Sequence, residues 1–167
     1  MGTLVGWKHC PRCAAPLERD GKTATCGACG FVTYASPEPT VCALVLDDEG
    51  RVLLARRRFE PQAGKWDLPG GFLDEDEEPL DGLRRELREE AGVEIEPLEL
   101  AGIWTDRYGD DDAAAATLNL YWTARIVSGE PTPADDVSEL RWFSLDDLPT
   151  DDELAFENVA QALGSRR

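Results

Sequence analysis

The segment from Trp66 to Gly92 constrains the fold of this chain more than any other part of the sequence. It begins as a loop rich in glycine and acidic residues, and from Leu80 onward it has the apolar spacing of an amphipathic helix. Pro79 suits a first helical turn, and Gly92 suits the position that ends a helix. The apolar stripe consists of Leu80, Leu83, Leu87 and Ala91. The segment therefore predicts a loop followed by a helix that is buried along one side.

Three glutamates crowd one edge of the predicted helix. Glu86 and Glu90 fall one turn apart beside the apolar stripe, and Glu89 lies close to both. Like charges at this spacing cost a few tenths of a kcal/mol each, and a bound divalent cation reverses the sign of that effect. Hard oxygen ligands favour Mg²⁺ or Mn²⁺. The edge is therefore predicted to hold such a cation, and the alternative is a solvated acidic face.

The same segment resembles the complete Nudix box. Gly71 is followed after five residues by Glu77, and after seven more by the run Arg85-Glu-Leu-Arg-Glu-Glu-Ala-Gly-Val93. The resemblance implies an α/β fold over residues 40–148, specifically the Nudix α/β/α sandwich, in which a mixed sheet lies between helices. It also implies an enzyme in which water attacks phosphorus and cleaves a pyrophosphate bond with the help of Mg²⁺ or Mn²⁺.

The resemblance assigns a role to each residue of the box. It implies that Glu86 and Glu90 are metal ligands and that the Gly70 carbonyl is a further metal contact. Glu89 would be a ligand or the base that polarises water, so Glu86 and Glu89 are catalytic candidates. The structural residues of the box would be Gly71, Glu77 and Arg85, and the last two are expected to pair and brace the loop.

A second acidic position lies near the end of the predicted domain. The run Val137 to Pro149 is similar to the closing strand and turn of many Nudix domains, where the glutamate before the Arg-Trp pair joins the metal. Glu139 is therefore an additional candidate ligand and catalytic base, and the alternative is an exposed strand residue. Competing acids on a predicted loop are Asp106, Asp110, Asp111 and Asp112.

Four cysteines define a separate module before this domain. Cys10 and Cys13 form one Cys-x-x-Cys pair, and Cys26 and Cys29 form a second pair twelve residues later, with a predicted hairpin turn at Asp20-Gly21. Four thiolates suit a closed, structural Zn²⁺ site, and so short a segment cannot fold on apolar burial alone. The alternatives are two disulfides or buried thiols. We therefore expect a small zinc ribbon over residues 1–34 and a Nudix hydrolase domain over residues 35–167.

Two apolar segments after the linker are predicted to pair as a hairpin. They are residues 40–46 and 51–57, and they flank the polar turn 47–50. A basic run, Arg56 to Arg58, ends the second strand, and Lys65 follows on the next loop. These cations suit contact with a phosphate and equally suit a solvated surface. The aromatic residues Trp66, Trp104, Tyr108 and Trp122 suit stacking on a base, but core packing is the more common use.

The charge of the chain limits its partners. Its formal net charge of −17 argues against non-specific binding of duplex nucleic acid, which depends on lysine and arginine. No apolar run approaches the roughly 20 residues of a membrane helix, and the N-terminus has no hydrophobic core followed by a cleavage site. We therefore expect a cytoplasmic protein that binds a small nucleotide and neither nucleic acid nor a membrane. Nudix relatives with such a ribbon are commonly dimers, which makes a homodimer possible.

The order of the two modules bears on the substrate. A zinc ribbon leading into a Nudix domain is similar to NADH pyrophosphatases and to related ADP-ribose or FAD pyrophosphatases. NADH pyrophosphatases carry a Ser-Gln-Pro-Trp-Pro-Phe-Pro-like motif after the box, whereas this chain has Gly102 to Gly109 there. The expected substrate is thus a nucleoside diphosphate linked to another group, of the ADP-ribose, FAD or NADH class. Two alternatives are a noncatalytic nucleotide sensor and an enzyme that removes nucleotide caps from RNA.

Overall fold

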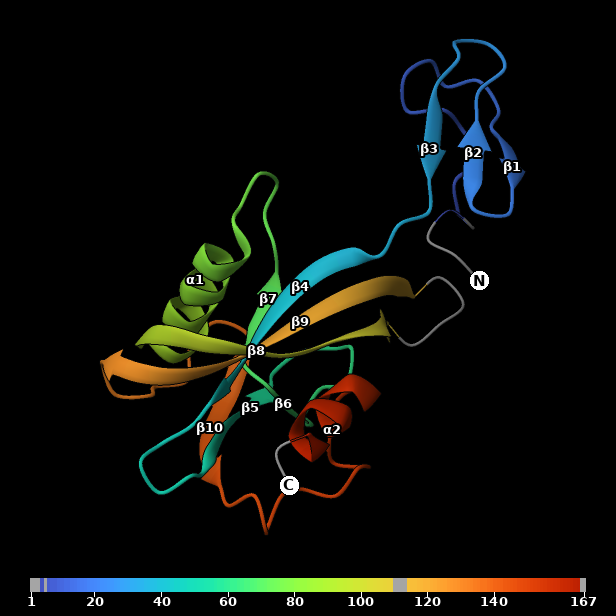
Figure 1. Ribbon diagram of the computed structural model, residues 1–167. Helices are drawn as coiled ribbons and strands as arrows, with labels where there is room; N and C mark the ends of the chain where they lie inside the picture. The colour runs from blue at the N-terminus through green and yellow to red at the C-terminus, as the bar shows by residue number, and fades with distance from the viewer. Residues whose placement is uncertain (1–3, 5, 110–113, 166–167) are drawn as a thin grey trace. The chain divides into compact units, whose positions relative to one another are not determined.

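The computed structural model describes residue 4, residues 6–109 and residues 114–165, and the chain divides into two compact units. The first unit comprises Met1–Glu38 and Arg107–Thr117, and the second comprises Pro39–Asp106 and Leu118–Arg167. Figure 1 labels the elements, which are β1 (Glu18–Asp20), β2 (Thr23–Thr25), β3 (Val32–Tyr34), β4 (Glu38–Val45), β5 (Val52–Arg57), β6 (Trp66–Asp67), β7 (Gly70–Phe72), α1 (Pro79–Ala91), β8 (Glu94–Tyr108), β9 (Ala115–Ser128), β10 (Val137–Phe143) and α2 (Glu157–Gly164).

The first unit contains a three-stranded antiparallel sheet in the order β1-β2-β3. Asp20 pairs with Thr23, which leaves a two-residue turn of Gly21 and Lys22, shifted by one residue from the predicted Asp20-Gly21. Gly21 occupies the left-handed region in this turn, with φ 55°. A glycine adopts that backbone conformation without steric cost, so the sequence determines the turn locally.

The second unit places its strands between two helices. One sheet has the order β7-β4-β9-β8 and the other has the order β10-β5-β6. Along β4, alternate side chains enter different cores: Val41 and Ala43 pack in the core that contains α1, whereas Cys42 and Leu44 pack in the core that contains α2. The layers are therefore helix, strands and helix, and the predicted α/β class and Nudix sandwich are confirmed.

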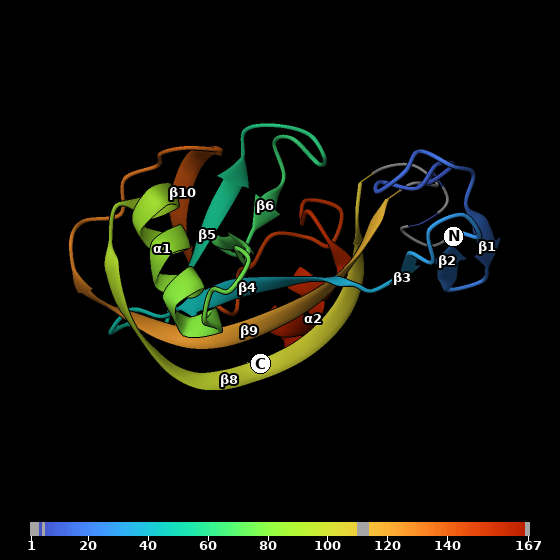
Figure 2. The same ribbon diagram turned by 90° about the horizontal axis from the view of Figure 1, so that it is seen from above.

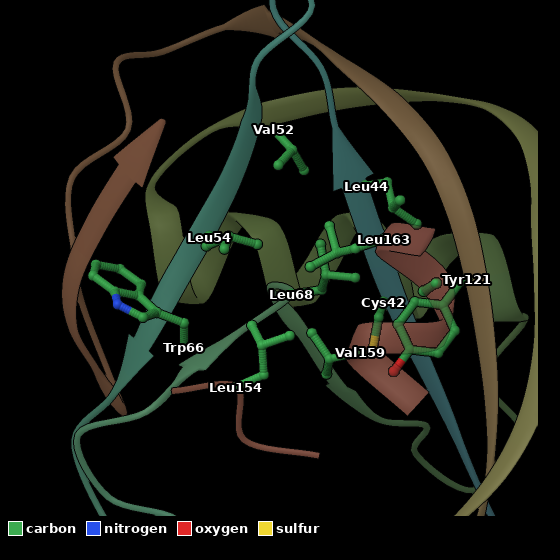
Figure 3. Close-up of a cluster of buried hydrophobic side chains, with 11 residues drawn as sticks. Cys42, Leu44, Val52, Leu54, Trp66, Leu68, Tyr121, Leu154, Val159 and Leu163 are labelled. Atoms are coloured by element: carbon green, nitrogen blue, oxygen red, sulfur yellow. The ribbon is translucent and has the colours of Figure 1, made fainter. Parts of the chain in front are cut away.

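The two cores are apolar and nearly closed to solvent. Leu83 and Leu87 of α1 are fully buried against β4, β5 and β9. Figure 3 shows the other core, where Val159 and Leu163 of α2 face the strands and the Tyr121 ring lies beside Cys42. Burying a side chain of this size stabilises a fold by roughly 1.5–3 kcal/mol. The strands are therefore fixed from both sides, which gives the loops between them a rigid frame.

The predicted hairpin of residues 40–57 forms only at its turn. The Asp47 side chain accepts hydrogen bonds from the backbone N–H groups of Glu49 and Arg51, and Leu46 bridges Val52. Beyond that point the two strands separate, because β4 joins one sheet and β5 joins the other. Each strand has buried residues on both faces and so can pair with a distant partner. Figure 2 shows the two long, curved neighbours β8 and β9 in the sheet that contains β4.

Helix α1 has the predicted boundaries, and its buried face contains Leu83, Leu87 and Ala91 of the predicted stripe. It begins at Pro79, and Gly92 caps it with φ 66° and a backbone N–H that bonds to the Arg88 carbonyl. Leu80 is only partly buried, and Glu90, predicted on an exposed edge, is 7% exposed. Contacts with Gly70 and with the segment before β10 cover this flank of the helix.

Within the described residues, no helix has both the length and the apolar character needed to span a membrane.

Candidate functional site

A bidentate ion pair between Arg85 and Glu77 joins the helix to the loop before α1. Arg85 donates from Nε to Glu77 Oε1 at 2.9 Å and from Nη2 to Glu77 Oε2 at 2.7 Å. Nη2 also donates to the Phe72 carbonyl at 3.1 Å, and the Asp74 backbone N–H donates to Glu77 Oε2 at 3.1 Å. The hydrogen bonds from Arg85 lower the pKa of Glu77 to about 2. A Cβ at Gly82 would lie 2.7 Å from Glu77 Oε2, so a residue without a side chain leaves room for this pair.

Two glycines of the loop allow the chain to run close to its neighbours. Gly70 has φ 144°, and a Cβ there would collide with the Val41 carbonyl of β4. At Gly71 a Cβ would lie 2.7 Å from the carboxyl carbon of Glu86. The Glu86 carboxylate therefore packs directly against the loop backbone, and any side chain at residue 71 would displace it.

Glu86 and Glu89 share one partner but differ in exposure. Arg85 Nη1 donates to Glu86 Oε1 at 2.7 Å and to Glu89 Oε2 at 3.2 Å. The Glu86 side chain is 13% exposed and that of Glu89 is 50% exposed. Burial raises the pKa of Glu86, and its hydrogen bond with Arg85 opposes that effect. Of Glu86, Glu89 and Glu90, Glu89 is thus the carboxylate that water reaches most easily.

Glu90 is the buried member of the set. Its Oε2 accepts a hydrogen bond from the Gly70 backbone N–H at 2.8 Å. No lysine or arginine pairs with it within the described residues, and its neighbours include the carboxylates of Asp136 and Glu86. Burial, followed by the charge of Asp136, raises the pKa of Glu90 well above the ordinary value. A divalent cation would suit this position, because it would supply the positive charge that Glu90 and Asp136 lack.

Asp136 was not singled out from the sequence, and the fold brings it to Glu90. The segment before β10 bonds to the carboxyl end of α1: the Ala134 N–H donates to the Glu90 carbonyl at 2.9 Å, and the Thr132 N–H donates to the Ala91 carbonyl at 2.9 Å. These bonds fix Asp136 beside the Glu90 side chain. The only sequence signal was an acidic residue directly before the closing strand.

Glu139 lies on the face of β10 that is turned away from α1. It stands opposite Arg56 in the β10–β5 pair and forms ion pairs with Arg56 and Arg141. Directly paired residues of antiparallel strands share a face, and the Arg56 guanidinium lies over the ring of Trp66 in the α2 core. The structure therefore does not bring Glu139 to the carboxylates of α1. Strand alternation and a register shift between Val137 and Glu139 separate it from Asp136.

A small hollow adjoins Glu90. It is lined by Ala55, Arg57, Asp67, Leu68, Gly70, Glu90, Asp136 and Val137. Arg57 Nη1 donates to Asp67 at 3.2 Å, and Arg57 Nε donates to the Pro61 carbonyl at 2.8 Å. Burial raises the pKa of Asp67 to about 6, although the charge of Arg57 lowers it. The hollow is thus lined by three acidic side chains and by a guanidinium that hydrogen bonds hold in place.

The remaining sequence candidates lie elsewhere. Asp106 accepts a hydrogen bond from the Asn158 backbone N–H at 3.1 Å, and Asp110, Asp111 and Asp112 lie outside the described residues. Trp66 is buried in the α2 core, Trp104 stacks edge-on against Tyr121 at 5.4 Å, and Trp122 packs in the α1 core. These aromatic residues therefore have packing roles.

The four cysteines of the first unit converge as predicted. The Sγ atoms of Cys10, Cys13, Cys26 and Cys29 all lie within 4.8 Å of one another. A tetrahedral Zn²⁺ with bonds of about 2.3 Å separates its sulfurs by roughly 3.8 Å, and the Cys10–Cys29 and Cys13–Cys26 pairs lie 3.5 and 3.6 Å apart. A hydrogen bond from the Cys29 backbone N–H is the largest influence that lowers the pKa of Cys26, to about 7. The cluster fits a structural zinc ion.

The two cysteine pairs have the same backbone geometry. The Cys10 N–H donates to the Ala15 carbonyl and the Cys26 N–H donates to the Phe31 carbonyl, both at 2.8 Å. Ala14 and Gly30, each directly after the second cysteine of its pair, have φ 58° and φ 72°.

Within the described residues, the four cysteines are the one set of three or more His, Cys, Asp or Glu residues whose ligand atoms lie this close together. The carboxylates of Glu86 and Glu89 are joined instead through Arg85.

Comparisons with known proteins agree with this geometry. A family model described as NUDIX domain matches residues 36–163. The chain is 33% identical over 146 residues to the NAD-capped RNA hydrolase NudC of Pseudomonas aeruginosa, covering 85% of this chain and 49% of that protein. It is 28% identical over 114 residues to the ADP-ribose pyrophosphatase of Methanocaldococcus jannaschii, covering 68% of this chain and 64% of that protein. The chain spans about half the length of the NudC relatives that it matches.

A solved structure has the same fold over nearly the whole chain. The crystal structure of a NUDIX hydrolase from Nitrosomonas europaea superposes with a TM-score of 0.76 at 25% sequence identity. The superposition covers 93% of this chain and 88% of that one.

Proposed function

Because this chain belongs to the NUDIX domain family, we propose that it hydrolyses the pyrophosphate bond of a nucleoside diphosphate linked to a second group, with the help of Mg²⁺ or Mn²⁺. The family assignment confirms the resemblance that residues 71–93 indicated. The observation that carries the proposal is Glu90, a buried carboxylate that has acidic neighbours and no cationic partner among the described residues.

The proposed donor set for the cation consists of oxygen atoms from two residues of α1 and from two residues of neighbouring segments. Glu86, Glu90 and Asp136 would hold the ion with the Gly70 carbonyl, and the braced loop would hold that carbonyl in place. When bound, a divalent ion at this position neutralises charge on the diphosphate oxygens and lowers the pKa of a coordinated water. Glu139 is left out of this donor set because it lies on the opposite face of β10.

Glu89 is the residue that we assign as the general base. Its side chain is half exposed, so a water molecule can reach the carboxylate without any movement of neighbouring residues. In the proposed step Glu89 takes a proton from water as the water oxygen bonds to phosphorus, and the bridging P–O bond breaks so that its electron pair leaves with the departing phosphate. ADP-ribose would give AMP and ribose 5-phosphate.

Release of AMP tests the substrate class. Purified protein is incubated with ADP-ribose, NADH, FAD and dinucleoside polyphosphates, each with Mg²⁺ and with Mn²⁺, and AMP is quantified. The relative named as an ADP-ribose pyrophosphatase supports ADP-ribose as a substrate, and the altered segment Gly102 to Gly109 argues against a preference for NADH. Absence of turnover on every member of this panel would refute the proposal and favour a noncatalytic sensor.

A matched pair of variants tests the site. Glu90→Gln removes the buried charge at nearly constant volume and should abolish turnover while the fold is retained. Glu94→Gln is the control, because Glu94 pairs with Arg88 at the surface. Normal turnover by Glu90→Gln in saturating Mg²⁺ would exclude the proposed donor set.

Removal of NAD caps from RNA is a second candidate. The relative named as an NAD-capped RNA hydrolase supports it, and the net charge of −17 opposes tight RNA binding. Capped RNA and free NAD would be compared at two salt concentrations. A higher kcat/KM for capped RNA that falls steeply with salt would favour this candidate.

We also propose that residues 1–34 form a zinc ribbon that precedes a catalytic domain of residues 35–167, with Zn²⁺ in a structural role. The protein works in the cytoplasm on a small nucleotide. A homodimer is its expected assembly, which light scattering of the purified protein would test.

A further inference from the structure

A second hollow lies in the catalytic unit, between the β5–β6 loop and the start of α2. Its volume is about 300 Å³, and it is lined by Gln62, Lys65, Asp151, Leu154, Ala155, Phe156, Glu157 and Ala160. None of these residues belongs to the donor set of the proposed cation. The hollow therefore needs its own explanation.

The lining combines an apolar wall with a polar rim. Leu154 belongs to the α2 core, and Phe156 and Ala160 pack against the same core. The polar residues that line the hollow are Gln62, Lys65, Asp151 and Glu157. Small-molecule sites commonly have this pattern, in which apolar surface holds a ring and a few polar groups orient it.

Lys65 is unusual in this chain. It is the one lysine after residue 22 in a sequence that carries 34 acidic residues. Its backbone is fixed, because the Arg57 N–H donates to the Lys65 carbonyl at 2.9 Å and the Lys65 N–H donates to the Gln62 carbonyl at 3.2 Å. Its side chain is only partly exposed, and no ion pair engages it in the part of the chain that the structure describes. The hollow thus contains a positive charge that can accept an anion.

One side chain connects this hollow to the proposed cation site. Arg57 lines the small hollow beside Glu90 and Asp136, and its guanidinium also lies 5.3 Å from the centroid of the Phe156 ring. Phe156 in turn lines the second hollow. The two hollows are therefore separated by a single side-chain contact, that of Arg57 on Phe156.

We propose that the hollow bounded by Lys65, Phe156 and Ala160 binds the nucleoside monophosphate half of the substrate. The base packs on the apolar wall, and the ribose hydroxyls donate hydrogen bonds to the rim carboxylates of Asp151 and Glu157. Lys65 pairs with a phosphate oxygen. This assignment rests on the proposed function for the identity of the substrate, and it is tested by binding instead of turnover.

The test uses calorimetric titration of the full chain with AMP, without a divalent cation. Lys65→Gln removes the charge, and Ala160→Phe fills the hollow. The matched control Arg88→Gln removes a surface cation that pairs with Glu94 outside the hollow. We expect both hollow variants to weaken AMP binding by at least about tenfold, which corresponds to about 1.4 kcal/mol, and the control to bind within about twofold of the wild type. Ribose 5-phosphate should bind all four proteins equally weakly.

The outcomes separate this proposal from the proposed function. Thermal unfolding checks that Ala160→Phe is folded, and Lys65→Gln stands as the second variant if it is not. Unchanged AMP affinity in the folded variants, or a wild type that binds AMP no better than ribose 5-phosphate, overturns the subsite. If the wild type releases AMP from ADP-ribose while the variants bind normally, only the subsite is refuted. If the variants lose AMP binding and the wild type shows no turnover, the subsite stands and the proposed function fails.

Discussion

The Glu90 carboxylate is buried beside that of Asp136, and no lysine or arginine of the described residues forms an ion pair with Glu90. The first residue belongs to α1 and the second to the loop that bonds to the carboxyl end of that helix. Two neighbouring acids in a buried position repel each other unless one is protonated or a cation separates them. This relationship links the stability of the protein to pH and to divalent ions.

The free energy of unfolding should fall as pH rises above about 4.5 in the absence of divalent cations. The pKa of Glu90 is raised above its ordinary value of 4.5, first by burial and then by Asp136, so its contribution to stability is complete below that value and is lost as pH rises through the folded pKa. Saturating Mg²⁺ should reduce this loss. Denaturant unfolding between pH 4.5 and 8, with and without Mg²⁺, measures both effects, and Glu90→Gln should flatten the profile.

Asp136→Asn should weaken Mn²⁺ binding by about 10–100-fold, a range typical of residues that support a metal site. Glu139→Gln should leave the affinity unchanged, because Glu139 lies on the other face of β10 with Arg56 and Arg141. Electron paramagnetic resonance of free Mn²⁺ during a titration gives both affinities. The reverse order of effects would restore Glu139 as the additional ligand.

Gly71→Ala should lower Mn²⁺ affinity and kcat together. The new Cβ would lie 2.7 Å from the Glu86 carboxyl carbon and would displace that side chain, at a stability cost of about 1–3 kcal/mol. Gly164→Ala is the control, because nothing lies within 4 Å of a Cβ there. Mn²⁺ titration and chemical denaturation separate the loss of the ligand from the loss of the fold. Wild-type affinity in a folded Gly71→Ala protein would contradict the assigned position of Glu86.

Glu77→Gln should remove a pH-dependent part of the stability in acid. Hydrogen bonds from Arg85 lower the pKa of Glu77 from 4.5 to about 2, so the contribution of this pair is present above 4.5 and is lost as pH falls toward 2. The difference in unfolding midpoint between the wild type and Glu77→Gln should therefore shrink over that interval. A difference that stays constant from pH 5 to pH 2 would show that the ion pair contributes nothing that depends on the Glu77 charge.

Cys26→Ser should release zinc and unfold the ribbon. Cys26 is buried, and its thiol has a pKa lowered to about 7, so it offers a thiolate near neutral pH. Atomic emission should find about one zinc ion per wild-type chain and clearly less in the variant. Cys42→Ser is the comparison, because Cys42 lies in the α2 core outside the cluster. Equal zinc content in Cys26→Ser and the wild type would exclude this ligand set.

The sequence predicted those features whose causes lie close together along the chain. The turn at Gly21, the cysteine pairs and the boundaries of α1 depend on residues a few positions apart. Glycine adopts a positive φ without strain, and proline suits a first helical turn, so neither requires a distant partner. The family pattern in residues 71–93 also carried the fold class and the family with it.

Only the tertiary structure decided which acids meet. Glu90 became buried because Gly70 and the loop before β10 close over it, and Asp136 reached it through hydrogen bonds to the end of α1. Glu139 lies three residues beyond Asp136 along the backbone and faces away, because strand alternation and a register shift are set by pairing with β5. The side on which a strand residue emerges depends on long-range pairing, and no local pattern in one sequence specifies it.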